Sequence, residues 1–147
     1  MPNRSSHPLL SHADSIATGM TDTLLLIGRV LVACVFLMTV WTGSPNVGYL
    51  TSINFVNPGI MSPLAIVVEW IIVISLVLGL GTRYGALLGL AFVIIATVAA
   101  HRYWGYPQAA QLVNYIFLTK NIAIAGGLII LFVTGAGRFS IDSKLSS

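Results

Sequence analysis

Four ionisable side chains stand within or at the edge of long apolar stretches, and they are the residues of this chain that could do chemistry. Arg29 lies in the first stretch, Glu69 in the second, His101 at the end of the third and Lys120 in the fourth. A charge in the hydrocarbon layer of a membrane costs about 2.5–3.5 kcal/mol on insertion scales, so it normally faces the protein interior and a partner. The pattern therefore predicts an internal polar cluster in a membrane protein.

Glu69 and Lys120 are expected to lie at equal depth. Each follows the start of its apolar stretch by about seven or eight residues, which at 1.5 Å per residue gives roughly 10–12 Å of depth if the two helices run in the same direction. Equal depth predicts a buried ion pair, the least costly way to hold either charge in a membrane. Arg29 lies nearer the inner side, where it is expected to pair with the C-terminus of the fourth helix or to extend to lipid headgroups.

A polar and aromatic pocket is expected around this pair, in the outer half of the bundle. Asn114 and Asn121 are seven residues apart and share one face of the fourth helix, beside Lys120. His101 and Arg102 close the outer end of the third helix. The aromatic residues expected at the pocket are Trp70, Tyr103, Trp104 and Tyr115.

Two interpretations of the pocket remain open. In the first, a quinone headgroup binds there: donors hold its carbonyl oxygens, and the acid or the histidine moves protons. The candidate quinone contacts are Glu69, His101, Lys120 and Asn121. In the second, Glu69 and Lys120 simply pair, Asn121 satisfies the remaining polar atoms, and the cluster only fixes the order of the helices. Taken without any resemblance, the residues favour this second, structural interpretation.

Several kinds of site are excluded by what the chain lacks. Its single cysteine, Cys34, rules out an intramolecular disulfide, a CxxC redox pair and a cysteine-based metal site. Only His101 stands near an apolar stretch, so a pair of haem ligands within the bundle is not expected. We therefore predict no intrinsic cofactor and no metal. Electrons would have to come from a partner's cofactor, which favours a non-catalytic subunit of an oxidoreductase-type complex over a complete enzyme.

The elements that position these residues are four predicted membrane-spanning helices. A run of about 20 apolar residues crosses the hydrocarbon layer, and the chain is 56% hydrophobic with only 7% charged residues, far below the roughly 25% of soluble proteins. The fold class is thus all-α, a polytopic four-transmembrane-helix bundle over residues 23–138, between a polar N-terminal tail (1–22) and a short C-terminal tail (139–147). The predicted spans are Thr23–Thr42, Ser62–Gly81, Arg83–Trp104 and Leu112–Ala136.

The connections between the spans carry further signals. The uncharged segment from Ser44 to Met61 is long for a helical hairpin, and we expect it to form a short interfacial helix or to fold back over the bundle. Ser62 and Pro63 are suited to begin the second span. Gly85 and Gly89 have the spacing that permits close approach of helices.

The basic residues predict the orientation. Four spans place both ends of the chain on one side, together with most of the positive charge: Arg4, Arg29, Arg83, Arg138 and Lys144. The positive-inside rule then predicts that both termini are cytoplasmic. The net charge of +3 is spread over the span ends without a basic run, so the expected partners are the lipid bilayer and other membrane-protein subunits, and no nucleic acid.

The order of these marks resembles the DoxX family of small bacterial membrane proteins, over about residues 24–142. The resemblance is carried by Gly28-Arg29, Glu69, Gly81-Thr82-Arg83, His101, Lys120-Asn121 and the ending Gly135-Ala136-Gly137-Arg138-Phe139-Ser140-Ile141-Asp142. It implies a multi-pass four-helix bundle of the bacterial inner membrane in which Arg29, Arg83, Arg138 and Asp142 are structural polar residues. The family's lysine late in the first span is missing here, where the chain reads Val40-Trp41-Thr42-Gly43.

The resemblance also bears on function. Relatives include the small membrane subunit of an archaeal thiosulfate:quinone oxidoreductase, and others are membrane partners in redox or oxidative-stress assemblies. This implies a subunit of a larger redox-linked membrane complex that contacts quinone in the outer pocket. The alternative is an auxiliary subunit that stabilises a respiratory or photosynthetic assembly and has no chemistry of its own. Transport is disfavoured, because neither an inverted repeat nor a discontinuous helix pair is evident.

Overall fold

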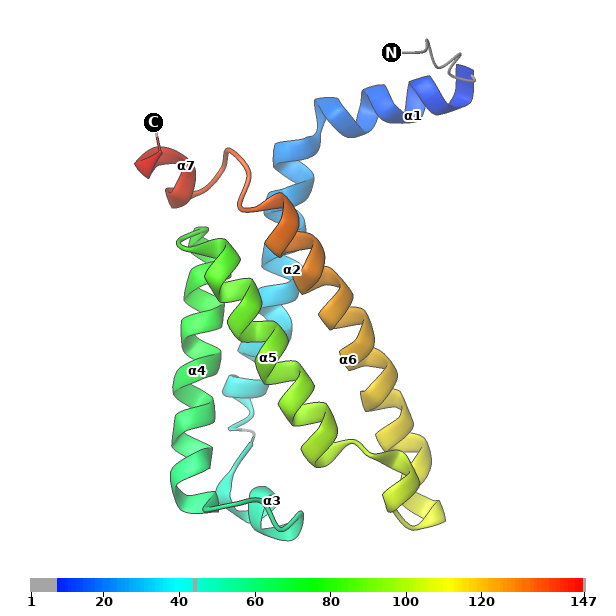
Figure 1. Ribbon diagram of the computed structural model, residues 1–147, viewed down its shortest axis with the longest axis vertical. Coiled ribbons are helices and arrows are strands. Elements are labelled where there is room, and N and C mark those ends of the chain that lie inside the picture. The colour runs from blue at the N-terminus through cyan, green and yellow to red at the C-terminus, as the bar shows by residue number, and fades with distance from the viewer. Residues whose placement is uncertain (1–7, 44, 147) are drawn as a thin grey trace.

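The computed structural model describes residues 8–43 and 45–146, which contain helices and connecting loops and no strand (Figure 1). Four helices of this part are long and apolar enough to cross a membrane, which confirms the predicted all-α class and four-span architecture. These long helices are α2 (Thr21–Trp41), α4 (Pro58–Leu78), α5 (Thr82–Ala100) and α6 (Gln108–Thr134). The short helices are α1 (Pro8–Gly19), α3 (Val47–Ser52), the 3-10 turn η1 (Tyr103–Gly105) and α7 (Ile141–Leu145).

The long helices pack as two pairs, α2 with α4 and α5 with α6, and α4 also contacts α5. Figure 1 shows that α4 and α5 leave their shared turn together and then diverge. We call the end of the bundle with this turn, α1 and α7 the terminal end, and the opposite end the α3 end. The divergence leaves space between the helices at the α3 end, and the candidate site lies there.

Close packing at the terminal half of the bundle depends on small residues. A Cβ atom added to Gly85 would collide with the Ser75 hydroxyl of α4, and one added to Gly89 would lie 3.2 Å from the Leu128 side chain of α6. The two glycines therefore let two different helices, α4 and α6, pack closely against α5, as glycine does where helix backbones approach each other. The buried apolar core around them is formed by Ala33, Phe36, Ile72, Val73, Leu76, Ala86, Val93, Leu128 and Leu131.

The second span begins earlier than the sequence indicated. Helix α4 starts at Pro58 rather than at Ser62 and Pro63, because Asn57 adopts a left-handed conformation (φ 46°) and Pro58 takes the first helical position. Proline suits that position, since its fixed φ is already helical and its missing N–H is not needed there. The Ser62 hydroxyl instead donates to the carbonyl of Pro45 at 2.8 Å and anchors the preceding loop.

That loop contains the expected short helix. Helix α3 begins after Asn46, whose side chain accepts a hydrogen bond from the Tyr49 amide at 2.8 Å, and such a cap satisfies one of the free N–H groups of a first turn. Leu50 of α3 is buried, and α3 contacts α4. The segment therefore lies against the α3 end of the bundle and bounds the space there.

Within the N-terminal tail, residues 8–19 form helix α1. This helix runs across the direction of the long helices (Figure 1), and α2 follows almost at once, at Thr21. Thr21 and Asp22 give no side-chain cap to α2; Asp22 accepts a hydrogen bond from the Arg138 amide at 2.8 Å instead. This bond ties the start of α2 to the chain after α6, so both lie on one side. Arg4 lies outside the described residues.

Candidate functional site

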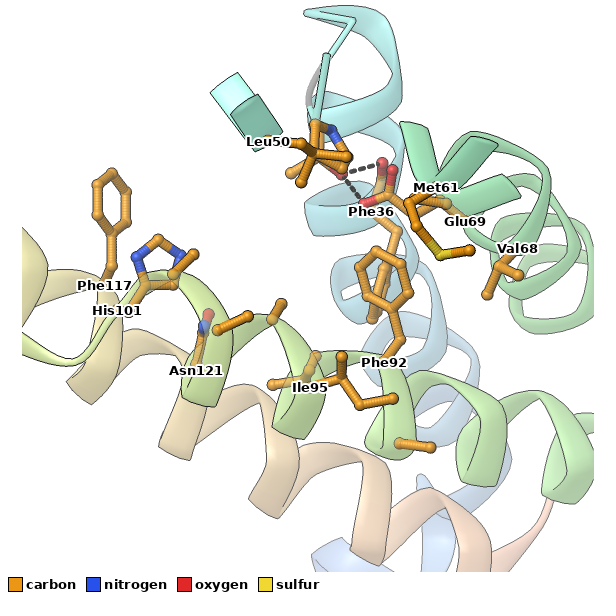
Figure 2. Close-up of a pocket in the computed structure, with 18 of the residues that line it drawn as sticks. Phe36, Leu50, Met61, Val68, Glu69, Phe92, Ile95, His101, Phe117 and Asn121 are labelled. Atoms are coloured by element: carbon orange, nitrogen blue, oxygen red, sulfur yellow. Dashed lines mark hydrogen bonds between the residues drawn. The ribbon is translucent and has the colours of Figure 1, made fainter. Parts of the chain in front are cut away.

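A cavity of about 520 Å³ lies among the long helices at the α3 end, with α3 along its border (Figure 2). Its volume falls in the range of about 300–1,000 Å³ typical of small-molecule sites. Most of its lining is apolar, including Phe36, Phe92, Ile95 and Phe117. The polar side chains in the lining belong to Thr39, Tyr49, Glu69, His101, Lys120 and Asn121. All four residues of the candidate quinone site therefore border one cavity.

Glu69 forms the polar part of one wall. Its side chain is 2% exposed, and Oε1 lies 2.6 Å from the hydroxyl of Thr39 on α2. That hydroxyl also lies 2.7 Å from the Phe36 carbonyl, and Figure 2 draws both hydrogen bonds. The second carboxyl oxygen, Oε2, has no hydrogen-bond partner among the described residues. A hydroxyl has only one hydrogen to give, so this pair of contacts can be satisfied in full when Thr39 donates to the carbonyl and the carboxyl donates to Thr39.

The other wall comes from α5 and α6. The amide of Asn121 donates to the Thr97 hydroxyl at 2.9 Å, and Thr97 donates to the Val93 carbonyl at 2.7 Å. Asn121 therefore links α6 to α5. Its position three residues before Ile124 and one turn after Phe117 explains why all three reach the cavity, because residues three and four apart share a helix face.

His101 and Lys120 gather at the end of this wall. The Nδ1 atom of His101 lies 3.4 Å from Oδ1 of Asn114, and its ring centroid lies 4.9 Å from that of Phe117. The Lys120 ammonium lies 4.8 Å from the centroid of the same Phe117 ring, in the arrangement of a cation–π contact. The cavity thus has an acid on the α4 wall and a cation beside an imidazole on the α5–α6 wall.

The expected ion pair between Glu69 and Lys120 is wrong: within the described part of the chain no salt bridge joins them. Glu69 is bonded to Thr39, and the Lys120 side chain extends over Phe117 of its own helix. Equal depth along two helices does not bring side chains together when the helices diverge, and here both residues border the same cavity without meeting.

The prediction of the aromatic residues at the pocket is also wrong, since none of the four lines the cavity. Trp70 is 44% exposed on the outer surface of α4, and Tyr103 packs edge-on against Trp104 and Tyr115 outside the cavity. The residues that do line it include Thr39 and Phe36 of α2, which the sequence did not single out. The sequence did hold one signal for Thr39, because a hydroxyl within an apolar run can mark a polar contact inside the bundle.

A second polar cluster lies at the terminal end and has Arg29 at its centre. The guanidinium is fully buried; Nη1 donates to the Ala136 carbonyl at 2.8 Å and Nη2 to the Phe139 carbonyl at 2.7 Å. Arg29 thus binds the chain just after α6, as one of the two expectations stated. Gly79 packs against this guanidinium so closely that any Cβ there would collide with it and with Ser140.

Asp142 completes this cluster by capping α5. Its carboxyl oxygens accept hydrogen bonds from the amides of Gly81 at 2.6 Å and Thr82 at 2.9 Å, and its own amide donates to the Gly79 carbonyl at 2.9 Å. Partial burial works to raise the pKa of this carboxyl, but the two amide hydrogen bonds and the nearby Arg29 charge outweigh it, so the pKa lies below its ordinary value. The carboxylate form therefore stabilises the junction between the α4–α5 turn and the chain after α6.

The other two residues expected to be structural lie in the same region. Arg83 donates to the Val133 carbonyl near the end of α6 at 3.3 Å. The side chain of Arg138 lies over the Phe139 ring, 5.9 Å from its centroid. The terminal cluster thus joins α2, the α4–α5 turn and the chain after α6. Within the described residues, no group of three or more His, Cys, Asp or Glu side chains is placed to hold a metal ion.

Comparison with known proteins identifies the family. The sequence profile of the DoxX family matches residues 24–102. The chain belongs to the DoxX family. It is 33% identical over 128 residues to the inner membrane protein YphA of Escherichia coli, an alignment that covers 82% of this chain and 89% of that protein. It is 29% identical over 131 residues to the inner membrane protein YqjF of the same organism, with 86% and 95% covered. No solved structure matches the chain.

Proposed function

We propose that this DoxX-family protein is an inner-membrane subunit of a redox-linked membrane complex and that its cavity holds a quinone headgroup. The names of the two relatives support the location, since both are inner membrane proteins. The distribution of basic residues favours an orientation with both termini in the cytoplasm. The observation that carries the quinone proposal is the mostly apolar cavity with Glu69 on one wall and Lys120 and His101 on the other.

The lining suits the chemistry of a quinone. A flat aromatic headgroup fits between apolar and aromatic side chains such as Phe36, Phe92 and Phe117. Its carbonyl oxygens accept hydrogen bonds, which the Lys120 ammonium can donate. A protonated Glu69 can donate one as well when its hydrogen is on Oε2 and the Thr39 hydroxyl donates to Oε1. Because Oε2 of Glu69 has no partner among the described residues, that oxygen is available to a bound molecule.

The same groups suit proton transfer. Reduction of a quinone to a quinol consumes two electrons and two protons. Glu69 is within reach of the cavity and is held by a hydroxyl that can accept or donate, so it can pass one proton at a time to a carbonyl oxygen. The electrons come from a cofactor of a partner subunit, which makes the protein a quinone-contacting subunit rather than a complete enzyme.

Binding is tested with the purified protein in detergent and a short-chain quinone such as decylubiquinone. We expect saturable binding that Glu69→Leu weakens by about tenfold, the effect of losing roughly 1.4 kcal/mol of hydrogen bonding. Lys120→Gln is expected to weaken it similarly. The matched controls are Asp14→Asn on α1 and Lys144→Gln on α7, which remove the same charges away from the cavity.

Proton transfer is tested in the native assembly, purified gently through a tag on this chain. Glu69→Gln keeps a hydrogen-bond donor but cannot release a proton, so quinone reduction by the complex should slow while KM for quinone changes little. Absence of saturable quinone binding would overturn the quinone proposal. Co-purification with a complex whose turnover is indifferent to Glu69 and Lys120 would establish the auxiliary, structural role instead.

A further inference from the structure

A second cavity adjoins the first at the α3 end. It has a volume of about 320 Å³ and lies between the end of α3 and the loop after α5. We call it the vestibule; its lining is Ser52, Ile53, Ala99, Arg102, Trp104, Gly105 and Tyr106. Ile53 and Ala99 also line the main cavity, so the two spaces meet at these two side chains.

Arg102 is the group in the vestibule that is available to a ligand. Its side chain is exposed and makes no hydrogen bond or ion pair with any residue in the described ranges. The hydroxyls of its neighbours are already engaged, because Tyr106 donates to the Ala100 carbonyl at 2.7 Å and Ser52 to the Tyr49 carbonyl at 2.7 Å. The guanidinium of Arg29, by contrast, donates hydrogen bonds to backbone carbonyls. The vestibule thus presents a guanidinium that has no partner among the described residues.

The position of Arg102 near the end of a membrane span suits contact with a lipid phosphate. It follows the last residue of α5 by two positions, near the end of the third membrane span. Trp104 beside it is 66% exposed, and tryptophan concentrates at the headgroup level of membranes. A guanidinium fork matches the oxygens of a phosphate and binds them in pairs, which a neutral or purely hydroxylic headgroup cannot reproduce.

Three residues of α5 lead from the border between the two cavities along the main cavity. Ala91, Ile95 and Ala99 are four residues apart on α5, so they form one stripe of about 12 Å along the helix. All three line the main cavity; Ala91 and Ile95 are exposed, and Ala99 is half-buried. The cavity is therefore open along this stripe to the hydrocarbon of the bilayer, from which an acyl chain can enter sideways.

We propose that the vestibule and the main cavity together hold one anionic phospholipid, with its phosphate on Arg102 and one acyl chain passing Ala99 into the main cavity. An acyl chain gains little by leaving one apolar surrounding for another, so selectivity comes from the headgroup. Phosphatidylglycerol offers Arg102 a phosphate with a net negative charge, whereas in phosphatidylcholine the choline cation offsets the charge of the same phosphate. This site uses neither Glu69 nor Lys120. The acyl chain and a quinone headgroup would compete for the main cavity, but lipid retention is scored on Arg102 and quinone binding on Glu69 and Lys120, so the two proposals can fail separately.

The test uses the purified full-length protein in a neutral detergent with phosphatidylglycerol and phosphatidylcholine of identical acyl chains, scored by native mass spectrometry. We expect one phosphatidylglycerol per chain to be retained in preference to phosphatidylcholine. Arg102→Gln should lower this retention by about tenfold, as loss of a charge-assisted hydrogen bond does. The matched control is Arg138→Gln, which removes an arginine that lies over Phe139 at the terminal end.

The passage between the two cavities is tested separately. Ala99→Phe should lower phosphatidylglycerol retention although Arg102 is intact, whereas Val98→Phe, on the neighbouring exposed position outside both cavities, should not. Glu69→Gln should leave retention unchanged. Equal retention by the Arg102→Gln variant, or indifference to Ala99→Phe, would overturn the proposal. So would displacement of the lipid by millimolar inorganic phosphate, since that would make the vestibule a site for free anions.

Discussion

Arg29 offers the sharpest test of what holds the bundle together. Its two hydrogen bonds, to the carbonyls of Ala136 and Phe139, reach more than a hundred residues along the chain and join α2 to the segment after α6. Replacement by methionine keeps a long side chain of similar shape but removes the charge and both donors. The two carbonyls then lose their side-chain partner in a buried site, where unsatisfied polar groups are costly.

The size of the effect follows from two opposing contributions. Each hydrogen bond from a charged donor contributes about 1.5–3 kcal/mol, so losing both costs about 3–6 kcal/mol. Methionine avoids the cost of keeping a guanidinium in an apolar layer, about 2.5–3.5 kcal/mol on insertion scales. From the middle of the two ranges, we expect Arg29→Met to lower the free energy of unfolding by about 1.5 kcal/mol, and Arg29→Lys to lie between the variant and the wild type.

The measurement is unfolding of the protein in mixed micelles with increasing SDS, followed by far-UV circular dichroism. Trypsin cleavage after Arg138 reports in parallel whether the segment following α6 has been released. Arg102→Gln serves as the control, because that exposed side chain has no described partner and its loss should change stability by less than about 0.5 kcal/mol. An unchanged SDS midpoint together with unchanged cleavage in Arg29→Met would refute the reasoning, because the two hydrogen bonds would then contribute no more than the burial of the guanidinium costs.

Two further variants test the same junction. Asp142→Asn should destabilise the protein at neutral pH. Because the pKa of this carboxyl is lowered in the folded protein, the stability that the carboxylate contributes is present above its ordinary pKa near 4 and is lost as the pH falls through the lowered pKa. The SDS-unfolding midpoints of wild type and variant should therefore converge in acid. Gly79→Ala should destabilise it more strongly, because Gly79 has a φ of 65° and its Cβ would collide with the Arg29 guanidinium. The control Gly126→Ala, at a helical position where a Cβ meets no described atom within 4 Å, should be neutral or stabilising by up to about 1 kcal/mol in the same assay.

The four membrane-spanning helices of this protein were largely predictable from the sequence, and the ionisable residues within them could be recognised there too. Four long apolar runs can satisfy their backbone groups in a membrane only as helices, which is why length and composition sufficed. The ionisable residues stood out because a charge in such a run needs a special surrounding. The position of Arg29 near the inner side left two alternatives, the end of the fourth helix or the lipid headgroups, and the structure has the first.

The partners of those residues were decided by the tertiary structure. Glu69 was expected to meet Lys120, yet it bonds to Thr39, and Lys120 lies over Phe117. Position along a helix fixes depth, but contact also depends on the direction in which each helix leans and on the face it presents. The long helices diverge after the α4–α5 turn that Asp142 caps, so a cavity lies between Glu69 on α4 and Lys120 on α6. No local pattern in the sequence records how the helices lean.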